Sequence, residues 1–89
     1  MATNWTDITS YSRGERKEPR TWELQLPWII IIVTRHKDYP GKWLMNCRQL
    51  CLDMHELTAK EIGDAREEAV KMCVDRCKEY LRSLLEQRM

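Results

Sequence analysis

The feature that most constrains the fold is an amphipathic C-terminal stretch, which runs from Thr58 to Met89. Its apolar residues recur mostly at three- and four-residue steps, so they share one face of a helix, and charged residues fall mainly on the other side. The pattern therefore predicts one long helix with one buried face, and it names no chemistry. The apolar face comprises Ile62, Ala65, Ala69, Met72, Cys73, Cys77, Tyr80, Leu81 and Leu84, and it is widened by Val70, Val74 and Leu85.

Two local patterns place the start of this helix. Thr58 and Glu61 have the spacing of a capping box, in which each side chain bonds the backbone N–H of the other residue. Leu57 and Ile62 have the spacing of a hydrophobic staple around the same cap. We therefore expect the helix to begin directly after Thr58.

The segment before the helix has the pattern of β-strands joined by short connections. Residues 21–26 alternate apolar and polar side chains, and residues 28–36 are β-branched and apolar on both faces at first. A Pro-Gly turn precedes a third strand over residues 42–48, and a shorter fourth strand is expected within residues 50–57. Short connections favour antiparallel pairing. The predicted fold class is α+β: an antiparallel three- or four-stranded meander packed by one long C-terminal helix, in the order β-β-β-(β)-α.

The chain of 89 residues is expected to form one domain. Residues 1–20 are polar with mixed charge, and we interpret them as a flexible N-terminal arm. Residues 21–89 are then the single α+β domain.

The predicted helix is too long for the predicted sheet. About thirty helical residues span roughly 45 Å, whereas a seven-residue strand spans about 23 Å. The overhanging part still carries Leu81, Leu84 and Leu85, which some other surface must cover. The candidates are the N-terminal arm and a second copy of the chain. We favour a homodimer, or another protein partner, because exposed apolar patches commonly mark protein interfaces.

A second candidate surface lies between Arg35 and Trp43, where basic and aromatic residues alternate. Arg35, His36, Tyr39 and Trp43 could hold phosphates and stack on bases. The alternative is a hairpin whose aromatic rings pack on each other and whose charges are solvated. Nucleic-acid binding is possible but not favoured, because the net charge is only +1.

Composition and motifs limit the cellular locations and the classes of function that we expect. The longest apolar run is too short to span a membrane, and the first residues lack the pattern of a secretory signal, so we expect a cytoplasmic protein. No catalytic, phosphate-binding or metal-ligand motif is found, and we expect no enzyme activity, cofactor or metal.

Four cysteines form two C-x3-C pairs, Cys47 with Cys51 and Cys73 with Cys77. They could be reduced thiols in the core, two disulfides or a zinc site. We favour core thiols, because free cysteine is often buried and no export signal is present.

Two resemblances extend this interpretation. Thr21-Trp-Glu-Leu, Val33-Thr-Arg-His, Tyr39-Pro-Gly-Lys-Trp and the Glu-rich helix beginning at Thr58 resemble small uncharacterised proteins of tailed phages and prophages. That resemblance implies a phage-type accessory protein in a bacterial or phage-infected cell, with no assigned activity. The paired C-x3-C spacing also resembles the small translocase chaperones of the mitochondrial intermembrane space, which are helical hairpins throughout.

Overall fold

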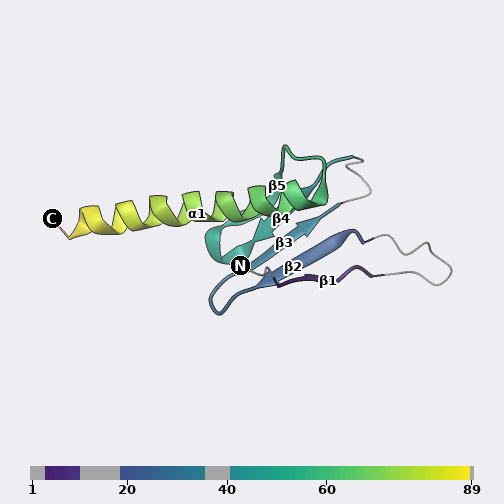
Figure 1. The fold of residues 1–89 in the computed structure, drawn as a ribbon. Helices are drawn as coiled ribbons and strands as arrows, with labels where there is room; N and C mark the ends of the chain where they lie inside the picture. The colour runs from purple at the N-terminus through teal and green to yellow at the C-terminus, as the bar shows by residue number, and fades with distance from the viewer. Residues whose placement is uncertain (1–3, 11–18, 36–40, 89) are drawn as a thin grey trace.

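The computed structural model describes residues 4–10, 19–35 and 41–88, in which an antiparallel sheet packs against one long helix (Figure 1). The strands follow one another in the sheet in chain order, and every neighbouring pair is antiparallel. The predicted α+β meander with a C-terminal helix is confirmed. The elements are β1 (Trp5–Asp7), β2 (Thr21–Gln25), β3 (Ile30–Thr34), β4 (Leu44–Cys47), the 3-10 helix η1 (Arg48–Leu50), β5 (Leu52–Glu56) and α1 (Ile62–Gln87).

The sheet has five strands rather than the three or four predicted, because part of the N-terminal segment joins it. Trp5 pairs with Leu24 in β2, and the Ile8 N–H donates to the Thr21 carbonyl over 2.9 Å. The prediction of a flexible arm is therefore wrong for residues 5–7, and residues 11–18 of the arm lie outside the described part. A three-residue strand is too short to show the period-two pattern that marks longer strands.

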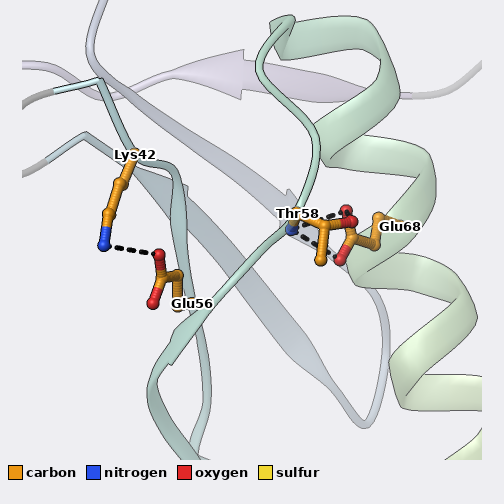
Figure 2. A network of polar contacts seen from close by, with 4 residues as sticks. All are labelled: Lys42, Glu56, Thr58 and Glu68. Atoms are coloured by element: carbon orange, nitrogen blue, oxygen red, sulfur yellow. Dashed lines mark hydrogen bonds and ion pairs between the residues drawn. The ribbon is translucent and has the colours of Figure 1, made fainter.

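The helix begins three residues later than the capping-box pattern indicated. α1 starts at Ile62, and the side chain of its N-cap residue, Glu61, makes no capping hydrogen bond. Instead, the carboxylate of Glu68 accepts hydrogen bonds from the Thr58 N–H over 2.9 Å and the Thr58 hydroxyl over 3.0 Å (Figure 2). It also accepts one from the Ala59 N–H over 2.9 Å. One carboxylate thus satisfies three donors, and the chain before Ile62 stays a loop.

The core lies between α1 and one face of the sheet. Ala65 and Ala69 on α1 are fully buried, so the helix backbone lies close to the strands. Ile31 and Val33 point into this core, whereas Ile30 and Ile32 lie on the opposite face and stay half-buried. The core cluster comprises Leu24, Ile31, Val33, Trp43, Met45, Cys47, Leu50, Leu52, Leu57, Ala65, Ala69 and Cys73.

Candidate interaction surface

The second half of α1 extends beyond the sheet, as the length argument predicted (Figure 1). The hydroxyl of Tyr80 donates a hydrogen bond to the carbonyl of Leu50 over 3.1 Å. This bond, called the tie below, connects α1 to η1. Beyond this tie, the exposed fractions of Leu81, Leu84 and Leu85 are 56%, 67% and 47%. Three leucines on the overhang are thus left largely in water, which is costly for apolar side chains.

An apolar groove of about 300 Å³ lies between α1 and the turn from β2 to β3. The Leu26 N–H donates to the Ile29 carbonyl over 2.8 Å and closes that turn. Trp28, at its tip, is 87% exposed. The groove is lined by Leu26, Ile29, Ile31, Val70, Cys73, Val74, Cys77, Lys78 and Leu81.

The groove and the overhang belong to one continuous apolar face of α1. Val70, Val74, Cys77, Leu81 and Leu84 follow each other at alternating steps of four and three residues, which is the spacing of the a and d positions in coiled coils. The inner part of this face lines the groove, and the outer part forms the overhang. We call the exposed apolar residues of this region the docking surface: Leu26, Trp28, Val74, Leu81, Leu84 and Leu85.

Of the residues predicted for the Arg35–Trp43 surface, the structure describes Arg35 and Trp43. Trp43 is only 4% exposed, and its indole N–H donates to the carbonyl of Lys60 over 3.0 Å. The Arg35 guanidinium carbon lies 4.9 Å from the centroid of the Trp43 ring and covers it from outside. The expectation that Trp43 contacts a partner is therefore wrong, because the ring is a core residue. His36 and Tyr39 lie outside the described residues.

The turn at Trp28 was missed by the sequence argument. The run of β-branched residues, apolar on both faces, predicted a central strand that begins at Trp28, whereas β3 begins at Ile30. The signal that could have revealed it is Pro27, because proline cannot donate a hydrogen bond to the sheet and favours a turn. An aromatic residue directly after it then projects from the tip.

Both edges of the sheet are unsuited to pairing with another sheet. β1 has only three residues, and β5 is irregular, with a bulge opposite residues 45–47 and a positive φ of 49° at Met54. Glu56 on β5 forms an ion pair of 2.9 Å with Lys42 (Figure 2). Short, bulged and charged edges oppose strand addition, so the docking surface is the better candidate for association.

The cysteines divide into two classes. Cys47 and Cys73 are buried, as predicted, but the prediction of core thiols is wrong for Cys51 and Cys77, which are exposed. All four are free thiols. Burial, the neighbouring Cys47 and then Cys77 raise the pKa of the Cys73 thiol to about 12, so it stays protonated at neutral pH.

Two further kinds of site were searched for in the part of the chain that the structure describes. Among these residues no three His, Cys, Asp or Glu side chains are grouped so that they could hold a metal ion. Nor does any described helix have the length and apolar character needed to cross a membrane.

Comparison with known proteins adds no relative to this picture. No family model, curated protein or solved structure matches the chain. The functional argument therefore depends on the geometry of the molecule itself.

Proposed function

We propose that this protein is an interaction module that forms a homodimer through its docking surface. The observation that carries the proposal is the continuity of the exposed leucines with an apolar groove on the same helix face. Each copy exposes Leu84 and Leu85 on its overhang and has an apolar groove beside Val74. The two leucines of one copy can therefore bind in the groove of the other. A surface that carries both halves of a contact can be complementary to itself.

The proposed arrangement has two-fold symmetry, with the two α1 helices antiparallel. The overhang of each copy then lies in the groove of the other. Because of the two-fold symmetry, the contact between overhang and groove occurs twice in the dimer. The coiled-coil spacing extends only from Val70 to Leu84, which is about two heptads. Such a short seam is weak alone, and the turn at Leu26 and Trp28 supplies the additional apolar contact.

The available area is of the size that a dimer needs. The exposed fractions on the docking surface correspond to an area on the order of 700 Å² per copy, close to the roughly 800 Å² that each partner contributes to a standard interface. Dimer formation also adds buried surface to a chain of 89 residues, whose own core is small.

The resemblance to small phage proteins supports an accessory role, in which the dimer binds a further protein. The nucleic-acid alternative is not adopted. One of its two stacking residues, Trp43, is buried, and carboxylates of Glu23 and Asp53 line the open face of the sheet. Negative side chains on that face oppose contact with a phosphate backbone.

Sedimentation equilibrium over a range of chain concentrations tests the dimer. We expect the wild-type chain to be dimeric at tens of micromolar, and Leu84→Glu to be monomeric with an unchanged circular dichroism spectrum, because a carboxylate cannot be buried unpaired in an apolar seam. Ser83→Glu is the matched control, since it adds the same charge one position away and outside the seam, and it should remain dimeric. A wild-type chain that is still monomeric at tens of micromolar would overturn the proposal, because the Kd of the dimer would then lie above that concentration.

A further inference from the structure

The face of the sheet opposite α1 carries a second and chemically different pocket. It has a volume of about 510 Å³ and a floor formed by Ile30 and Ile32. The other lining residues belong to β2, β4, η1 and β5, and most of them are polar or charged. Ligand pockets in proteins typically measure about 300–1,000 Å³ and combine an apolar lining with a few placed polar groups. The lining residues are Glu23, Ile30, Ile32, Asn46, Arg48, Gln49, Asp53 and Met54.

Two amide side chains in the wall are fixed by bonds to the backbone. The Asn46 Oδ1 accepts from the Met54 N–H over 2.7 Å, and the Gln49 Oε1 accepts from the Ile30 N–H over 3.2 Å. Because the oxygen of each amide is already used, its NH2 group is the part left to donate to a ligand. The pocket therefore has two oriented donors before any ligand arrives.

The backbone around the pocket is held in an uncommon conformation. Met54 has a φ of 49° and Cys51 a φ of 57°, although neither is glycine. The register between β4 and β5 also shifts between Met45 and Cys47. Positive φ at non-glycine residues and bulges concentrate at functional sites. Here they turn Met54 and Asp53 toward the open face, where both line the pocket.

The charges of the pocket are not neutralised within the described residues. Arg48 supplies a guanidinium, and Glu23 and Asp53 supply carboxylates from two different strands. The ion pairs found among the described residues join Lys42 to Glu56 and Arg76 to Glu79, so they involve none of these three groups. Opposite charges around an apolar floor are complementary to a ligand that carries both signs.

We propose that this pocket binds a small zwitterion with an aliphatic body, of the class of α-amino acids with leucine-like side chains. Arg48 and the two amide NH2 groups receive the carboxylate, because guanidinium and amide donors suit its oxygens. Glu23 and Asp53 receive the ammonium group, and the aliphatic part lies on Ile30 and Ile32. The pocket and the docking surface lie on opposite faces of the sheet, so this proposal does not depend on the dimer.

Titration of ¹⁵N-labelled protein, followed by NMR, tests the proposal with L-leucine as the probe. We expect saturable shifts of the side-chain NH2 signals of Asn46 and Gln49. Two analogues separate the charges: 4-methylpentanoate lacks the ammonium group, and 3-methylbutylamine lacks the carboxylate. Each should bind at least tenfold more weakly than L-leucine. No saturable shift with L-leucine, or equal binding of either analogue, would overturn the proposal.

Single substitutions test whether L-leucine binds in this pocket. Arg48→Gln should weaken L-leucine binding at least tenfold, whereas the matched control Arg82→Gln, which removes the same charge from exposed α1, should leave it unchanged. The monomeric Leu84→Glu variant should bind L-leucine as the wild type does, so the failure of one proposal can be told from the failure of the other. Equal binding by Arg48→Gln and the wild type would place the ligand elsewhere and overturn the assignment.

Discussion

At the scale of single residues, Glu68 fixes the local course of the chain before α1. Its carboxylate holds the loop before α1 through Thr58 and Ala59 (Figure 2). Burial acts to raise the pKa of Glu68, but the hydrogen bonds from the Thr58 and Ala59 N–H groups and the Thr58 hydroxyl together outweigh it. The pKa of Glu68 therefore lies below its ordinary value, which means that the folded state favours the charged form.

Replacing this carboxylate should make stability less dependent on pH. Because the folded-state pKa is depressed, the stabilisation is complete above the unfolded pKa of about 4.3 and is lost as the pH falls through the folded pKa. We expect Glu68→Gln to lower the free energy of unfolding by about 1 kcal/mol at neutral pH, as loss of a helix cap does, and by much less in acid below the folded pKa.

Urea unfolding of Glu68→Gln at neutral and acidic pH, in the monomeric Leu84→Glu background, measures this difference. The matched control is Glu67→Gln, which removes the same charge from the exposed neighbour. It should leave stability nearly unchanged at both pH values. An equal loss for Glu68→Gln at neutral and acidic pH would show that the charge of Glu68 is not what stabilises the loop.

At the scale of elements, α1 has two parts in different environments. Its first part is anchored by Ala65, Ala69 and Cys73 in the core. Its last part, after the tie between Tyr80 and Leu50, has no sheet beneath it (Figure 1). Isolated helices shorter than about 12–15 residues are marginal in water, so the overhang depends on its connection to the anchored part or on a second copy.

Hydrogen exchange should separate the two parts of the helix. In the monomeric Leu84→Glu variant, we expect slow exchange for amides around residues 69–77 and fast exchange over residues 81–88. In the wild-type dimer both parts should exchange slowly, because the seam covers the overhang. Residue-resolved exchange measured by NMR provides the comparison. Equal exchange over residues 81–88 in the two proteins would argue against a covered overhang.

At the scale of the whole molecule, the fold is a two-layer domain with one helix on one face of its sheet. The Cα extents of 59 × 25 × 21 Å show how far the helix lengthens an otherwise small unit. Such a shape has a large surface relative to its volume. A small domain of this kind is expected to have a low free energy of unfolding. Association with a second copy, as proposed, would bury more apolar area.

The melting temperature should therefore depend on the concentration of the chain. For a dimer that unfolds to separate chains, a tenfold rise in concentration stabilises the folded state by about 1.4 kcal/mol, which corresponds to a rise in Tm of roughly 3–6 °C for about 180 residues. Calorimetry at two concentrations measures this shift, and Leu84→Glu should show none. A wild-type Tm that is independent of concentration would contradict dimeric unfolding.

The candidate surface could be predicted only in part. Helical periodicity and helix length together placed Leu81, Leu84 and Leu85 beyond the sheet, because both quantities are local. The groove beside them could not be predicted, since it depends on where the turn at Trp28 meets α1. The burial of Trp43 could not be predicted either. The side-chain pattern of a strand does not indicate which end of that strand the helix will cover.

The sequence by itself determined the order of the predicted strands, the C-terminal helix and the class of the fold. Side-chain periodicity is set by the backbone geometry of a helix or a strand, and it can be read without knowing any neighbour. The tertiary structure alone decided that β1 joins the sheet, that Glu68 rather than Glu61 bonds Thr58, and that Trp43 is buried. Each of these depends on contacts between residues distant in sequence, where several partners with similar local patterns compete and packing selects one.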